Sequence, residues 1–235
     1  MPRDLTRYLD QSRLLSVSLV ASLPVLALYE IGIIATGSRV ENHVSALVKR
    51  MIAILGGHAY LVLTGLTATC FVVALLVKRR GPAKDFSFYW VMAIEAGLYA
   101  AILGPVIHLV GIRLAAGPDA AEFLHQAILY VGAGVWEELF FRLALLGGFV
   151  ALTVRTMGGN ALVFTVLGLL LSSAAFSLIH HLGPMGDPFE ARVFLFRMAA
   201  GAVLGSLFLL RGLGICVYTH ALYNVGLLLI RSAEM

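Results

Sequence analysis

Charged residues are scarce in this sequence, and their scarcity limits the class of protein that it can encode. Asp, Glu, Lys and Arg make up 13% of the 235 residues, whereas hydrophobic residues make up 60%. The mean hydropathy is +0.93. Soluble domains carry about 25% charged residues, so this composition excludes an ordinary soluble domain and predicts a protein that lies in a lipid bilayer.

Cysteine, polar linkers and repeats are also rare or absent. Cys70 and Cys216 both fall in apolar stretches, and their spacing gives no support for a disulfide. We interpret Cys216 as a small residue at a helix contact. The sequence has no long polar linker, no low-complexity tract and no clear repeat, which predicts one compact helical domain.

The apolar runs predict an all-α, polytopic transmembrane helical bundle of about seven spans. A span needs about 20 predominantly apolar residues, and the runs are continuous rather than alternating, which argues against β-strands. The stretch at 40–55 carries several charges, which suit a helix on the membrane surface or an extension of the second span. The fourth run is long, so that helix tilts or includes an interfacial part. The predicted spans are Leu14–Thr36, His58–Val77, Phe88–Val110, Phe123–Val154, Ala161–His181, Val193–Leu210 and Ile215–Ile230.

The formal net charge of +4 is explained by membrane topology. Basic residues lie between the apolar runs instead of forming one patch, so we expect no nucleic-acid partner. Arg3, Arg7 and Arg13 precede the first span, and a basic segment follows the second. The positive-inside rule therefore predicts a cytoplasmic N-terminus. We expect a multi-pass protein of the cell membrane, specifically a bacterial inner membrane.

Polar residues inside the fourth span are candidate functional groups, because a charge at the centre of a bilayer costs about 2.5 to 3.5 kcal/mol. Glu138 and Arg142 are four residues apart, so on a helix they share a face and form an ion pair. Glu137 is rotated from Glu138 by about 100° and has no cation at that spacing. Glu137 is therefore the sharper candidate for chemistry, although the ion pair alone could be purely structural.

Two later spans add histidines and a carboxamide. His180 follows Phe176 near the end of the fifth span, and we interpret Phe176 as packing. His220 and Asn224 are four residues apart in the last span and project from one face. These groups suffice to activate a water molecule and to stabilise an oxyanion. The span boundaries place His180 and His220 at depths that differ by about 15 Å, so the boundaries carry less weight than the set of residues.

The order Glu-Glu-x-x-x-Arg, then Phe-x-x-x-His, then His-x-x-x-Asn, each on its own hydrophobic segment, resembles the CPBP family, also called Abi, of CAAX-processing and bacteriocin-processing membrane proteases. The resemblance covers Tyr130 to Leu228. We expect residues 121–235 to form the catalytic helical core and residues 1–120 to form N-terminal transmembrane helices of the same bundle. Leu143 departs from the pattern, since many members have glycine there.

The resemblance implies an intramembrane endopeptidase of the glutamic type that cleaves a peptide or a membrane-anchored protein. It implies that Glu137 is the general base on water and that His180 helps to orient that water. It implies that His220 and Asn224 donate to the oxyanion. It implies neither a cofactor nor a metal ion. The residues that it implies as supporting are Glu138 and Arg142.

Other functions fit some of these residues. A zinc-dependent protease is one alternative, because two histidines and a glutamate can make a catalytic zinc site, but the sequence contains no His-Glu-x-x-His motif. A transporter could use the buried ions as a proton relay, and a non-catalytic immunity or scaffolding protein could retain the fold. His181 could share the task of His180. The residues expected to pair between helices or to snorkel are Glu30, Glu95 and Arg197.

Overall fold

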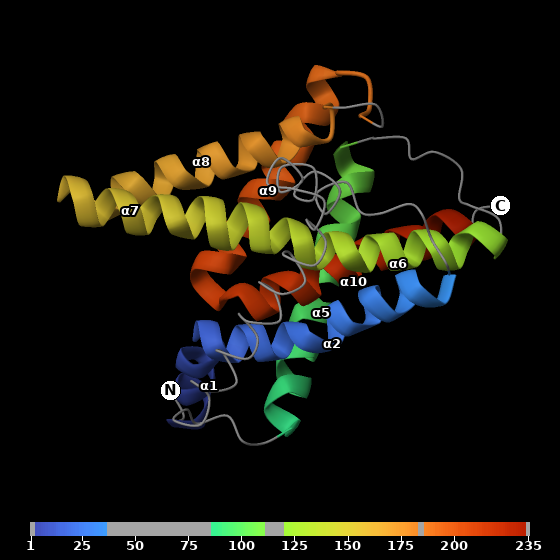
Figure 1. The fold of residues 1–235 in the computed structure, drawn as a ribbon, viewed down its shortest axis with the longest axis horizontal. Helices are drawn as coiled ribbons and strands as arrows, with labels where there is room; N and C mark the ends of the chain where they lie inside the picture. Colours follow the sequence, from blue (N-terminus) through green and yellow to red (C-terminus); the bar gives the residue numbers. More distant parts are fainter. Residues whose placement is uncertain (1–2, 37–85, 111–119, 183–185, 234–235) are drawn as a thin grey trace, which may run out of the picture.

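The computed structural model of the protein describes residues 3–36, 86–110, 120–182 and 186–233, and the regular structure in these ranges is entirely helical. Figure 1 shows the arrangement of the helices. In chain order they are α1 (Arg3–Ser12), α2 (Leu15–Thr36), α5 (Phe86–Val110), α6 (Ala120–Glu137), the π-helix η1 (Glu138–Gly147), α7 (Gly148–Met157), α8 (Ala161–Ile179), α9 (Ala191–Arg211) and α10 (Leu213–Ala233).

Within the described residues, six helices are long and apolar enough to cross a bilayer. They coincide with six of the predicted spans, so the all-α, multi-pass fold is confirmed for this part of the chain. Large apolar side chains such as Ile31, Ile102 and Leu162 are exposed on these helices, as expected of surfaces that face lipid. The predicted span at His58–Val77 and the predicted surface helix at 40–55 lie outside the described residues.

The fourth predicted span is one continuous rod made of α6, η1 and α7 (Figure 1). Its membrane-length segment has 36 residues, about 54 Å at 1.5 Å per residue, which exceeds the roughly 30 Å hydrocarbon core. The sequence predicted regular α-helix throughout, but Glu138–Gly147 is a π-helix. Such segments have i→i+5 hydrogen bonds and often occur at functional sites.

Helix α10 lies at the centre of the packing, against α2, α5, α6 and α9, while α8 packs against α9 and η1. In Figure 1, α5 crosses the direction of α6 steeply. The backbones of α6 and α10 meet at Gly134, where an added Cβ would lie 2.7 Å from the backbone nitrogen of Ala221. On α9, a Cβ on Gly201 would lie 3.2 Å from the Cα of Ser173. The absence of a side chain at Gly201 therefore permits a close approach of α8 and α9.

A cluster of polar side chains ties α1 and α5 to the end of α9. The Arg211 guanidinium donates to both carboxylate oxygens of Glu95, at 2.6 and 2.9 Å. The hydroxyls of Tyr8 and Tyr99 also donate to Glu95. Burial raises the pKa of Tyr8, in α1, well above its usual value, and the Glu95 carboxylate adds to this effect. Glu95 thus pairs between helices as predicted, and its partner Arg211 directly precedes Gly212 (φ 87°), after which α10 begins.

Candidate active site

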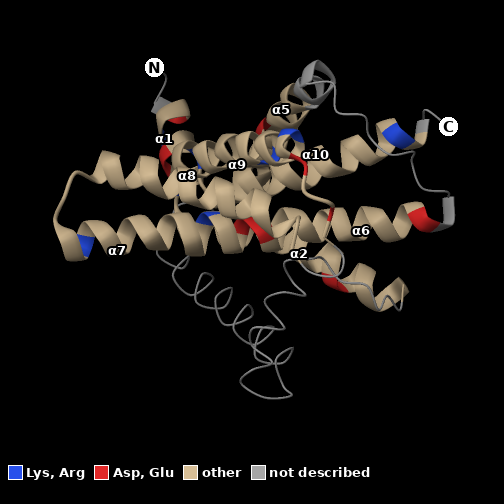
Figure 2. Ribbon diagram, turned by 90° about the horizontal axis from the view of Figure 1, so that it is seen from above, with Lys and Arg blue, Asp and Glu red and all other residues tan. Residues whose placement is uncertain are grey.

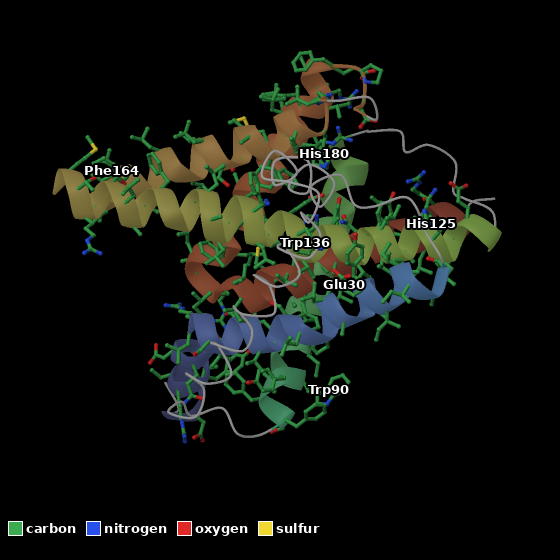
Figure 3. The ribbon with its side chains drawn as sticks, viewed as in Figure 1. Glu30, Trp90, His125, Trp136, Phe164 and His180 are labelled. Atoms are coloured by element: carbon green, nitrogen blue, oxygen red, sulfur yellow. The ribbon has the colours of Figure 1, made fainter. Side chains whose placement is uncertain are left out.

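Acidic and basic residues meet at the middle of the α6–η1–α7 rod, whereas most of the remaining ribbon is uncharged (Figure 2). Glu137 ends α6 and Glu138 begins η1, and they are only 4% and 0% exposed. Figure 3 places His180 and Trp136 toward the middle of the molecule and His125 far along α6 toward its N-terminal end. Two consecutive carboxylates are therefore buried where α6, η1, α8 and α10 come together.

Glu138 is held by three side chains. Arg142 Nη1 lies 3.1 Å from Glu138 Oε1, which confirms the predicted ion pair. His220 Nδ1 lies 2.7 Å from the same oxygen, and Cys216 Sγ donates to Glu138 Oε2 at 2.8 Å. Because Arg142 also donates to the Gly201 carbonyl at 3.3 Å, this network links η1 to α9 and α10. Both oxygens of Glu138 are occupied, so its carboxylate is suited to a structural task.

His220 lies between the two glutamates. Its Nδ1 must donate to Glu138, because an ionised carboxylate only accepts hydrogen bonds. Its Nε2 faces Glu137 Oε2 at 3.8 Å, which is too long for a hydrogen bond. The Glu137 carboxylate makes no hydrogen bond within the described ranges, so it differs from Glu138 in having oxygens free for a small molecule. No pattern in the sequence indicates that one imidazole lies between both acids.

The Phe176 ring brings the polar groups of three helices together. Its centroid lies 5.1 Å from that of His180 and 6.1 Å from that of His220. The Arg142 guanidinium carbon lies 4.5 Å from the same centroid, a cation–π contact. Phe176 is buried, as predicted for a packing residue. The depth difference expected from the span boundaries is absent, because both histidines border one ring.

His180 caps the C-terminal end of α8, just beyond the membrane-length helix. Its Nδ1 lies 2.8 Å from the Phe176 carbonyl oxygen, so Nδ1 carries the proton that is donated there. Burial lowers the pKa of His180, and the nearby Glu137 carboxylate opposes this effect in part. The neutral form therefore dominates near pH 7, with Nε2 as a proton acceptor.

The remaining predicted residues lie in different surroundings. His181 turns to the following loop, where its Nδ1 lies 3.1 Å from the Asp187 carbonyl oxygen and its ring contacts Phe189. Arg197 was expected to pair between helices or to snorkel, and it instead pairs at 2.6 Å with the carboxylate of Asp187 in the loop before α9. Asn224 is partly buried on α10, and its side chain forms no hydrogen bond with the part of the chain that the structure describes. The network thus includes His220 but not Asn224.

The same residues lack the arrangement that a metal ion needs. Among the described side chains, no group of three or more His, Cys, Asp and Glu is arranged to hold a metal ion. Glu138 is already bound to the Arg142 cation, and Cys216 donates its thiol proton instead of presenting a thiolate. The donor set therefore does not fit a zinc site.

Cys216 was predicted to be a small residue at a helix contact, and it is fully buried where α10 packs on α9. That prediction missed its hydrogen bond to Glu138. The signal was present in the sequence, since Cys216 precedes His220 by four residues and so lies on the same face of the helix. Cysteine is usually read as a small apolar residue, and only the rotation of α10 in the fold reveals its donor role.

Comparison with known proteins identifies one family. Residues 119–226 match the family described as "Type II CAAX prenyl endopeptidase Rce1-like". No curated protein and no solved structure matches the chain. The matched segment contains η1, α8, α9 and most of α10, and therefore every residue of the network around Glu138. The chain is a multi-pass membrane protein whose residues 119–226 match the CPBP, or Abi, family of CAAX-processing membrane peptidases.

Proposed function

We propose that the protein is an intramembrane endopeptidase of the glutamic type and that Glu137 is its general base. One observation carries this proposal: two consecutive buried glutamates have opposite surroundings. Glu138 is occupied by Arg142, His220 and Cys216. Among the described residues, the Glu137 carboxylate accepts no hydrogen bond, and the His220 Nε2 lies 3.8 Å from it. A general base needs free lone pairs next to its substrate, so the uncommitted carboxylate is the better candidate.

The first step is activation of water between Glu137 and His180. Neutral His180 donates from Nδ1 to the Phe176 carbonyl, which leaves its Nε2 lone pair to accept a hydrogen bond from the water. Glu137 takes the water proton as the oxygen attacks the scissile carbonyl carbon. Protonated Glu137 then delivers that proton to the departing amide nitrogen as the carbon–nitrogen bond breaks. Both proton transfers use one carboxyl group, so the reaction needs no further acid.

His220 and Asn224 are the proposed donors to the tetrahedral oxyanion. Since Nδ1 of His220 is engaged by Glu138, its Nε2 can donate only when the ring is protonated. The carboxylates of Glu137 and Glu138 lie on opposite sides of the ring, with Nε2 toward Glu137 and Nδ1 toward Glu138. The Asn224 amide has its N–H groups available. Donors held in place before the reaction stabilise an oxyanion without the cost of reorganisation.

The proposed substrate is a peptide or a membrane-anchored protein, and the test looks for its products. Cells that carry the wild-type protein or the Glu137→Gln variant are compared for protein N- and C-termini in the membrane fraction. We expect termini that appear only with the wild type, because the amide of Gln accepts no proton from water at neutral pH. Glu122→Gln is the matched control, since Glu122 is an exposed acid on the same rod, and it should give the wild-type set.

The same comparison separates the alternatives. The termini should still form when the purified, reconstituted protein is treated with a strong chelator, because the donor set does not fit a metal ion. Loss of cleavage on chelation would support a zinc enzyme instead. Equal sets of termini from the wild type and Glu137→Gln would refute the glutamic mechanism.

A further inference from the structure

The Cys216 side chain has a hydrogen-bond role that neither the catalytic proposal nor the family match uses. Its sulfur lies at the contact of α9 and α10 and is fully buried. Sγ is 2.8 Å from Glu138 Oε2 and 3.1 Å from the Leu204 carbonyl oxygen. A thiol has one proton, and a bond to an ionised acceptor is roughly twice as strong as one to a neutral acceptor. The proton therefore goes to Glu138.

The other contacts of Glu138 make this bond consequential. Arg142 and His220 both approach Oε1, so Cys216 provides the hydrogen bond to Oε2 within the described residues. Glu138 is 0% exposed, so solvent does not replace a lost donor. A buried carboxylate oxygen without a partner is costly, and the carboxylate would rotate toward another donor.

Rotation of Glu138 would change the state of His220. Glu138 Oε1 accepts the Nδ1 proton of His220 and thereby fixes both the tautomer and the tilt of the ring. The opposite nitrogen, Nε2, faces Glu137. Loss of the hydrogen bond at Glu138 Oε2 would therefore rotate the rigid Glu138 carboxylate. This rotation would move the His220 ring, and with it the Nε2 atom that faces the proposed base, Glu137.

We propose that Cys216 is a positioning residue: its thiol donates to Glu138 Oε2 and thereby holds Glu138 in the orientation that aligns His220 with Glu137. Cys216 contacts neither Glu137 nor the proposed position of the water, so it is not itself a catalytic residue. The proposal rests on the proposed function for its kinetic consequence and on geometry alone for the hydrogen bond.

The first test measures the hydrogen bond without any substrate. The S–H stretching band of Cys216 is assigned in the infrared spectrum of the purified protein from the difference between wild type and Cys216→Ala. We expect the wild-type band to be shifted to low frequency, as for a strong donor. Glu138→Gln should move the band back up, because the acceptor loses its charge. A band that is unchanged in Glu138→Gln would overturn the proposal.

The second test measures cleavage in cells, as the rate at which the termini that depend on Glu137 appear. Cys216→Ala should lower this rate roughly 10- to 100-fold, since the charged acceptor loses its donor. Cys216→Ser keeps a donor at this position and should restore the rate to within about threefold of wild type. Thr219→Val is the matched control, because it removes a buried donor from the same helix that points to the Ala96 carbonyl on α5.

The outcomes separate the two proposals. A wild-type rate in Cys216→Ala, no rescue by Cys216→Ser, or an equal loss in Thr219→Val would each show that Cys216 has only a packing role. If no termini depend on Glu137, the glutamic mechanism fails. The infrared test then still decides whether Cys216 holds Glu138, so failure of one proposal is distinguishable from failure of the other.

Discussion

Replacing Arg142 with methionine should destabilise the protein more than any change of an exposed cation. The side chain is 0% exposed, forms an ion pair with Glu138 and lies over the Phe176 ring. Methionine keeps much of the volume and fills an apolar space well, so Arg142→Met chiefly removes charge. Glu138 then keeps its own charge without the cation that compensates it.

The size of the effect follows from these contacts. Removing one partner of a buried ion pair costs about 3 to 5 kcal/mol, and a desolvated cation–π contact contributes up to about 2 kcal/mol. The two losses share one group and do not add, so we expect a loss of about 3 to 5 kcal/mol in total. For a chain of 150 to 250 residues this corresponds to a fall of roughly 6 to 20 °C in the unfolding temperature.

The assay heats the purified protein in detergent and measures the fraction that remains monodisperse by size-exclusion chromatography. Arg155→Met is the control, because Arg155 is exposed at the end of the same rod, and such changes cost within about 0.5 kcal/mol. Adding Glu138→Gln to Arg142→Met should recover part of the loss, since it removes the uncompensated charge. An Arg142→Met variant that is inactive but unfolds at the wild-type temperature would refute this reasoning.

Two further predictions concern other parts of the network. His220→Ala and Asn224→Ala should each slow single-turnover cleavage by a factor of roughly 10² to 10³, with little change in substrate binding. The double variant should lose less than the product of the two factors. A double variant whose loss equals that product would show that the two side chains serve different atoms. Glu95→Gln should lower the unfolding temperature in detergent, because Arg211 loses its carboxylate partner. The cleavage rate of the protein that remains folded should stay within about threefold of the wild-type rate. A large loss of cleavage rate without loss of stability would assign Glu95 to the chemistry.

The sequence predicted those features that depend on neighbours along one helix. Continuous apolar runs predicted the spans that the structure describes, and a spacing of four predicted the pair of Glu138 and Arg142. Both arguments need only the helical repeat and the cost of burying charge. The family motifs likewise led to the segment that matches a known family.

Features that depend on the rotation of one helix against another were not predictable. The pair of Glu95 and Arg211 joins residues separated by 116 positions, and the bond between Glu138 and His220 joins residues separated by 82. The helical repeat defines which residues share a face but not which helix that face meets. The π-helix was missed for a different reason, because no local sequence pattern distinguishes it from α-helix.

The different fates of the two consecutive glutamates follow from helix geometry. The side chains of adjacent residues on a helix point about 100° apart, so one donor atom cannot contact both carboxylates. An imidazole placed between them can meet each with a different ring nitrogen, and His220 does so, with Nδ1 toward Glu138 and Nε2 toward Glu137. This placement requires α10 to lie very close to α6, and the absence of a side chain at Gly134 permits that approach. Because Glu138 is held by its partners on η1 and α10, its link to His220 is fixed. In the proposed mechanism, the longer contact between His220 and Glu137 is therefore the one that opens to admit water.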